Sequence, residues 1–246
     1  MPSIEDRIKE MENNLGDMKP TFAVFGPEGV GKTTFVSYAP NLLIIDVENG
    51  RSSIMKTPNE PKVFEPENCD DLTEIYIYLK ANEDKFDSVA IDTFTEVEKW
   101  FLDDVIKKQA KKDSTKDTDL ATQADYKKAS HRMRKMARKF RALDMYTFFI
   151  CHEREDKDDN TGIVRKAPAV MPSVMKDLNA FTDFIFFLSV DENGGRKLQT
   201  APSNRIRAKH RIGELPRVID LGNNVEDCRI DMVLDMIDNS SKKGDK

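Results

Sequence analysis

The sequence lacks the features that define several protein classes. It has only three cysteines among 246 residues, far apart and with no C-x-x-C pair, which argues against a disulfide framework or a zinc site. No apolar run approaches the roughly 18 residues that a membrane helix requires, and residues 1–20 are too charged for a secretory signal. Positive charge is not in excess, because 39 Lys and Arg face 44 Asp and Glu for a net charge of -5. We expect a soluble cytoplasmic protein with no membrane contact, with buried or idle thiols, that does not coat duplex DNA by bulk charge.

Alternating strand-like and helix-like patterns predict the fold class. Strand patterns occur at residues 21–25, 42–47, 88–92, 145–151, 184–190, 196–200 and 217–221. Helical patterns occur at residues 69–79 with Asp70 as N-cap, 93–105, 125–143 and 225–237, while 107–119 and 153–172 read as mobile polar segments. Such alternation predicts an α/β fold with a mainly parallel sheet flanked by helices, and an Asn-Gly turn adds an antiparallel hairpin at one edge. We divide the chain into an N-terminal helix (1–18), one core domain (19–222) and a C-terminal helix with a polar tail (223–246).

One motif stands between the first predicted strand and the helix that follows it. It matches G-x-x-x-x-G-K-[ST], and its residues are Gly26, Pro27, Glu28, Gly29, Val30, Gly31, Lys32 and Thr33. A curled loop of this kind turns backbone N–H groups towards a polyphosphate. Lys32 would reach the β- and γ-phosphates, Thr33 would bind Mg²⁺ and Thr34 could donate to the α-phosphate. The alternative is a glycine-rich turn with a chance lysine, but we favour nucleotide binding, and ATP over GTP because no N-K-x-D motif occurs.

Two further strands end in acids that would complete such a site. Asp92 ends an apolar strand and could hold Mg²⁺ opposite Thr33, or it could instead cap the next helix. Glu48 or Asp46, after the second strand, could orient or deprotonate the attacking water. Exposed loop acids with no catalytic role are the alternative for this pair.

Together these segments, with residues 148–153, resemble the core of RecA-type ATPases. They are most similar to the small core-only RecA-like ATPases of bacteriophages that act in single-strand annealing or recombination, over about residues 19–221. The resemblance implies that Glu48 is the catalytic glutamate, that Asp92 is the Walker B acid and that Asp46 supports them. It places His152 where a γ-phosphate sensor often stands, although that residue is commonly Gln, and a hydrogen-bonded structural histidine is the alternative.

A basic segment at residues 205–213 is similar to the K-x-R-x-G segment of related ATPases. The resemblance implies that Lys209 and Arg211 reach the γ-phosphate of a neighbouring subunit, which would make turnover depend on a homo-oligomer, either ring or filament. A solvated basic loop is the alternative.

Residues 127–141 contain eight Lys or Arg, one His and no acid, which is typical of a surface that gathers phosphates. Only a subset can share one helical face at 100° per residue. By the resemblance, residues 107–119 and 154–166 hold the places of loops that line a DNA path, with Arg165 and Lys166 as contacts. The prediction is an Mg²⁺- and ATP-dependent protein that binds single-stranded DNA, in the host cytoplasm if phage-encoded, with a single-strand DNA-binding protein as a candidate partner.

Two rival functions remain open at this stage. A P-loop kinase of a small molecule would need an Arg-bearing lid, and residues 196–211 could imitate one. A nucleotide-switched regulatory module would bind ATP and barely hydrolyse it. Glu48 at a strand end favours hydrolysis over both.

Overall fold

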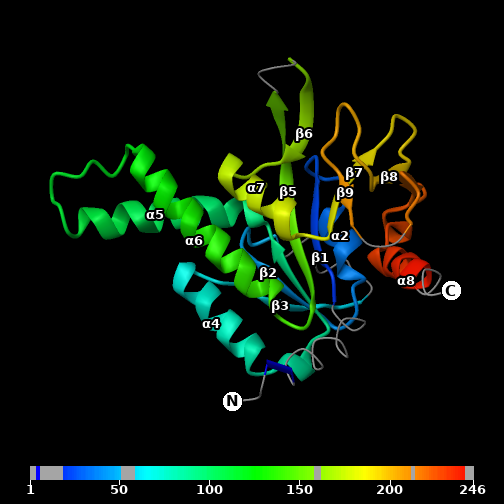
Figure 1. Cartoon of the computed structure of the whole chain (residues 1–246), viewed down its shortest axis with the longest axis horizontal. Coiled ribbons are helices and arrows are strands. Elements are labelled where there is room, and N and C mark those ends of the chain that lie inside the picture. Colours follow the sequence, from blue (N-terminus) through cyan, green and yellow to red (C-terminus); the bar gives the residue numbers. More distant parts are fainter. Residues whose placement is uncertain (1–3, 6–18, 51–58, 158–161, 212–213, 242–246) are drawn as a thin grey trace.

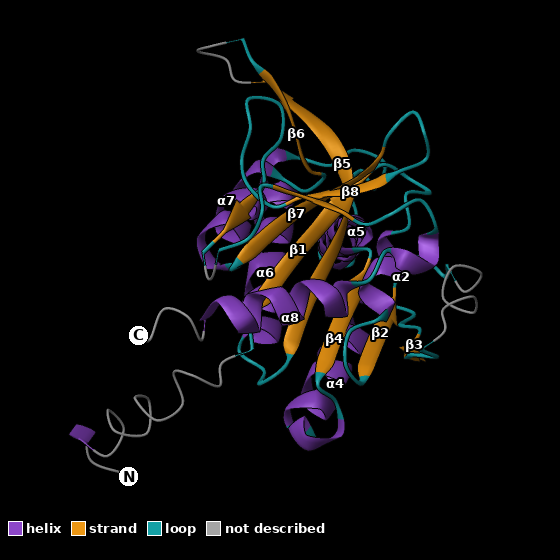
Figure 2. Ribbon diagram, turned by 90° about the vertical axis from the view of Figure 1, so that its right-hand side faces the viewer, coloured by secondary structure: helices purple, strands orange, loops and turns teal. Residues whose placement is uncertain are grey.

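A computed structural model of the chain describes residues 4–5, 19–50, 59–157, 162–211 and 214–241. Its centre is a ten-stranded sheet with the order β10-β8-β7-β1-β5-β4-β2-β3, in which β6 also pairs with β5 and β9 with β7. The predicted helix at residues 1–18 lies almost wholly outside the described residues. Figures 1 and 2 show the sheet running through the middle of the molecule with helices on both sides.

Six neighbouring strands of this sheet are parallel. They are β7 (Phe184–Val190), β1 (Thr21–Gly26), β5 (Tyr146–Lys157), β4 (Ser88–Asp92), β2 (Leu42–Asp46) and β3 (Lys62–Phe64). The antiparallel strands are β6 (Val164–Pro168), β8 (Arg196–Gln199), β9 (Lys209–His210) and β10 (Val218–Asp220). The predicted fold class is therefore confirmed, including the antiparallel hairpin at one edge.

Helices cover both faces of the sheet because its central strands are buried on both sides. One face packs against α4 (Cys69–Lys80), α5 (Phe94–Ala110), α6 (Gln123–Arg141) and α7 (Pro172–Phe181). The other face packs against α2 (Lys32–Ser37) and α8 (Ile230–Ser241). Short 3₁₀ turns at Glu83–Lys85 and Val225–Asp227 complete the described elements.

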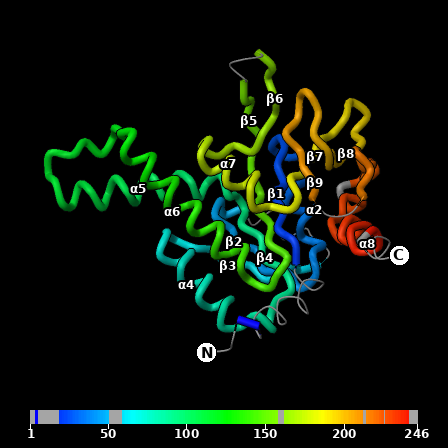
Figure 3. Tube along the Cα trace, in the orientation of Figure 1, coloured from blue at the N-terminus to red at the C-terminus, as the bar shows by residue number. Residues whose placement is uncertain are grey.

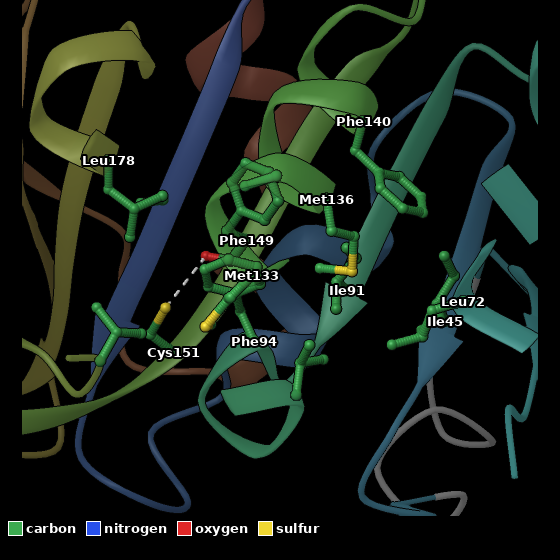
Figure 4. Packing of buried hydrophobic residues seen from close by; sticks show 14 of the residues in the cluster. Ile45, Leu72, Ile91, Phe94, Met133, Met136, Phe140, Phe149, Cys151 and Leu178 are labelled. Carbon is green, nitrogen blue, oxygen red and sulfur yellow. Dashed lines mark hydrogen bonds between the residues drawn. The ribbon is translucent and has the colours of Figure 1, made fainter. Parts of the chain in front are cut away.

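Aromatic and aliphatic side chains from strands and helices interlock in the core. Phe149 of β5 lies 4.6 Å, ring centre to ring centre, from Phe94 at the start of α5. Met133, Met136 and Phe140 of α6 pack against the same face of the sheet (Figure 4).

The three cysteines are free thiols and all are buried, as expected. Burial raises the pKa of Cys69 to about 11, which keeps this thiol protonated and unreactive.

Three local predictions were wrong. Helix α4 takes Asn68, not Asp70, as its N-cap, because the Asn68 side chain accepts the Asp70 and Asp71 amides. The segment expected to be flexible at 153–172 instead forms the end of β5, the whole of β6 and the start of α7. Helix α5 runs to Ala110, into the part read as a mobile loop.

Among the described residues, no helix combines the length and apolarity needed to cross a membrane.

Candidate functional site

The candidate site lies at one edge of the sheet, where the parallel strands end. Gly26 at the end of β1 is in register with His152 of β5, and Asp46 at the end of β2 is in register with Asp92 at the end of β4. Carboxyl ends of parallel strands form the usual ligand crevice of α/β sheets. The topology thus brings the predicted loop, acids and histidine to the same edge.

The loop at residues 26–33 is curled, as the motif predicts. Gly29 and Gly31 have φ angles of 71° and 97°, in a region of backbone conformation that residues with a Cβ atom rarely adopt. Lys32 is only 8% exposed, and its ammonium donates to the carbonyl oxygens of Gly26, at 3.0 Å, and Pro27, at 2.7 Å. Burial lowers the pKa of Lys32, and the nearby Asp92 carboxylate opposes that shift. Val30 is buried in the core and anchors the loop, while Glu28 is exposed.

Thr33 and Asp92 meet across the gap between the loop and β4. The Thr33 hydroxyl donates to Asp92 Oδ2 at 2.6 Å. Helix α5 takes Thr93 as its N-cap, so capping does not occupy Asp92. Burial raises the pKa of Asp92 to about 6, and the hydrogen bond from Thr33 only partly offsets this effect. A buried carboxylate beside a hydroxyl offers the oxygen ligands that Mg²⁺ prefers.

Glu48 is held by two side chains. Thr93 Oγ1 and His152 Nε2 each lie 2.7 Å from Glu48 Oε1. Burial works to raise the pKa of Glu48, but these two hydrogen bonds, together with the charges of His152 and Lys32, outweigh it and the pKa is lowered. Glu48 is therefore a carboxylate at neutral pH, and both contacts fall on the same oxygen.

Asp46 lies beside this pair in a more enclosed position. Its Oδ1 accepts the Gly50 amide at 3.0 Å, whereas Oδ2 is buried and has no hydrogen-bond partner among the described residues. Burial raises the pKa of Asp46. A buried carboxylate oxygen without a partner is costly, so the site suits a cation or a cation-bound water. The oxygens of Thr33 and Asp92 are thus of the kind that Mg²⁺ prefers, and Asp46 adds negative charge close to Asp92.

Lys209 and Arg211 are not brought to this edge. Lys209 Nζ donates to the carbonyl oxygens of Asn179 and Thr182, at 2.7 and 2.5 Å, and Arg211 Nη2 donates to that of Ala180 at 2.5 Å. These carbonyls lie at the C-terminal end of α7, where cations are favourable. Burial lowers the pKa of Lys209 to about 8.

The strand register shows how far away this basic pair is. The Arg211 amide bonds to the Asp183 carbonyl, and the Asp183 amide bonds to that of Thr21, where β1 begins. Five strand steps of about 3.3 Å separate Thr21 from Gly26, so about 16 Å of strand lies between Arg211 and the loop. The geometry thus assigns the pair a capping role within the chain, and any contact with a phosphate would be with that of a neighbouring copy.

Sequence reasoning missed two hydroxyls beside the acids. Thr93 donates to Glu48, and Thr95 Oγ1 accepts the His152 amide at 3.1 Å. A signal for Thr93 was present, because T-x-x-E at residues 93–96 is a helix-start pattern, and the Thr93 side chain does accept the Glu96 amide. Nothing in the sequence indicates Thr95, whose role depends on how α5 sits against β5.

Comparison with known proteins yields one family. A family model described as "AAA domain" (AAA_24) matches residues 18–212, which is most of the chain and includes the loop, both acidic strand ends and the basic pair. No curated protein matches the chain.

Proposed function

Because the chain belongs to the AAA domain family of P-loop ATPases, we propose that it is a RecA-like, Mg²⁺-dependent ATPase that acts on single-stranded DNA. In this proposal it assembles as a homo-oligomer and promotes annealing or recombination for a bacteriophage. A single-strand DNA-binding protein would be a natural partner. The observation behind the ATPase part is the 2.6 Å contact between Thr33 and Asp92, which sets a loop hydroxyl against a strand-end acid.

In this proposal each residue of the site has its own role in ATP hydrolysis. The loop amides and the Lys32 ammonium bind the phosphates, with Thr34 beside the α-phosphate, and Thr33 and Asp92 hold the metal. When bound, Mg²⁺ would offset the negative charge of the phosphates. Asp46 adds negative charge on the metal side of the site.

Glu48 acts on the attacking water. Its Oε1 is taken up by Thr93 and His152, so Oε2 is the oxygen that can accept the proton. As the water oxygen bonds to the γ-phosphorus, the bond to the leaving oxygen breaks and its electron pair stays on ADP. His152 positions Glu48 through its hydrogen bond, and its place in β5 beside Gly26, where β1 ends, also suits contact with the γ-phosphate.

The rival kinase function has less support. Residues 196–211, which could have formed a mobile Arg-bearing lid, are instead tied to the body by β8, by β9 and by backbone bonds between Lys166 and both Arg205 and Arg207.

ATP turnover with and without single-stranded DNA tests the proposal. Wild-type protein should hydrolyse ATP, faster with DNA, and Lys32→Ala should fold yet lose turnover because the buried ammonium is gone. Glu74→Gln, an exposed acid of α4, serves as a control that keeps full activity. Unchanged turnover in Lys32→Ala would disprove the phosphate-loop assignment. ATP binding without hydrolysis in the wild type would favour a regulatory module instead.

A further inference from the structure

Helices α5 and α6 form an arm that extends from the body of the protein. Figure 3 shows the two helices side by side and joined at the far end of the arm. The guanidinium of Arg132 in α6 pairs with Asp104 of α5 and lies 4.9 Å from the ring centre of Phe101. These contacts fix the spacing of the two helices.

A second set of contacts fastens the connection between them. Asp125, buried at the start of α6, accepts hydrogen bonds from Lys116 Nζ at 2.6 Å, from Thr122 and from Gln109. The hydrogen bond from Lys116 is the largest of the effects that lower the pKa of Asp125, so this carboxylate stays charged throughout the usual pH range. The connection between α5 and α6, which lies in the segment predicted to be a mobile loop, is therefore fastened to the start of α6 by the contact between Lys116 and Asp125.

The arm carries a groove of about 510 Å³ between its two helices. No acidic or aromatic residue lines it, and its basic lining residues are Lys108, Lys112, Lys127, Lys128, His131 and Arg132. Asp104 pairs with Arg132 and Lys108 from outside the groove. Lys112, Lys127 and Lys128 are exposed, and none of the carboxylates in the described residues forms an ion pair with them. The groove therefore holds uncompensated positive charge.

A second groove on the other side of α6 differs in this respect. It is also basic, but Asp177 of α7 lines it and pairs with Arg138 at 2.8 Å and with Arg134 at 4.0 Å. Two of the cations of α6 are thus neutralised within the chain. The two sides of α6 thus differ: Arg134 and Arg138 pair with Asp177 on the α7 side, whereas Lys127 and Lys128 on the α5 side have no ion-pair partner among the described residues.

We propose that the groove between α5 and α6 binds the phosphodiester backbone of single-stranded DNA. This inference rests on the proposed function and assigns the residues that touch the DNA. Lysine ammonium groups attract phosphates as point charges, and the fixed walls reduce the ordering needed on binding. Because no aromatic side chain lines the groove, bases cannot stack there, so binding is by backbone and independent of sequence.

The test compares two double variants that each remove two positive charges. Lys127→Gln/Lys128→Gln removes cations from the groove, while Lys99→Gln/Lys176→Gln removes exposed lysines of α5 and α7 that line neither groove. Binding of a fluorescent oligo-dT is measured by anisotropy over a series of salt concentrations, together with thermal unfolding and DNA-free ATP turnover. Poly-glutamate is added as a competitor, because an acidic peptide is the other polyanion that could enter the groove.

We expect the groove variant to bind oligo-dT roughly five- to tenfold more weakly, with folding and DNA-free turnover unchanged. The slope of log affinity against log salt should become shallower by up to about 1.4, since each lost phosphate contact removes about 0.7. The control variant should keep the wild-type slope.

Four other results would contradict the groove assignment, and the last of them would also contradict part of the proposed function. Equal slopes in wild type and groove variant would place the DNA elsewhere and leave the proposed function intact. An equal loss in the control variant would mean that total charge, not the groove, attracts DNA. Displacement by poly-glutamate at an equal concentration of charge would assign the groove to an acidic protein segment. Wild-type protein that hydrolyses ATP but binds no oligo-dT would overturn both the groove assignment and the DNA part of the proposed function.

Discussion

Replacing Asp92 with Asn should make the protein more stable and, at the same time, inactive. Asp92 is 8% exposed, and burial raises its pKa from the ordinary 3.8 to about 6. A carboxyl whose pKa is higher in the folded state than in the unfolded state is a weaker acid when folded, so the fold loses stability as the pH rises from about 4 to 6. Above pH 6 the buried charge is present at full cost.

The size of this cost follows from the two pKa values. A difference of about two pH units corresponds to about 3 kcal/mol, at 1.36 kcal/mol for each unit. Asn removes the charge and keeps an oxygen to accept from Thr33, but its new NH₂ group needs a partner of its own, which costs about 1 to 2 kcal/mol. We therefore expect Asp92→Asn to stabilise the metal-free protein by about 1 to 2 kcal/mol at pH 7.5.

Urea unfolding at pH 7.5 and pH 5.0 measures the effect. The advantage of Asp92→Asn over wild type should shrink by about 1.4 kcal/mol at pH 5.0, where wild-type Asp92 is mostly protonated in the folded state. Asp103→Asn, an exposed acid of α5, should show no such pH dependence. Mg²⁺ with a non-hydrolysable ATP analogue should stabilise only the wild type strongly. A variant that is less stable than wild type at pH 7.5, or a gap that does not change with pH, would refute the reasoning.

Two other substitutions test the remaining parts of the site. Glu48→Gln should bind a fluorescent ATP analogue within a few fold of wild type and lose at least about a hundredfold in phosphate release, because the proton acceptor is gone; normal release would place the base elsewhere. Arg211→Ala should lower the free energy of unfolding by roughly 0.5 to 1 kcal/mol, since one bond at the end of α7 disappears. If Arg211 also acts between subunits, mixing Arg211→Ala with Lys32→Ala should restore some turnover, whereas no recovery at any ratio would leave it the capping role alone.

Much of the architecture could be predicted because the strong signals are local. The central strands are apolar runs bounded by turn residues, and the G-x-x-x-x-G-K-[ST] spacing marks the loop after β1. The convergence of Asp92, Glu48 and His152 on one edge also followed, since the carboxyl ends of parallel strands meet there.

What could not be predicted depends on contacts between distant residues. Strand β6 lies in a polar stretch whose order comes from pairing with β5, and α7 begins at the end of that stretch and packs through the buried Val174 and Leu178. Strand β3 has only three residues and no clear pattern of its own, and it exists because β2 offers it an edge. The bonds of Lys209 and Arg211 to the end of α7 were equally invisible, because nothing local links residues 30 positions apart.

The position of α5 connects the arm to Glu48, the residue to which the proposed function assigns the attacking water. The helix starts at Phe94, directly after the Thr93 hydroxyl that holds Glu48, and its 17 residues extend about 25 Å towards the tip of the arm. It is one uninterrupted rod, so a small tilt imposed at the distant end turns its first residue as well. If the arm binds DNA as proposed, a force on its tip would therefore also act on Thr93, which holds Glu48.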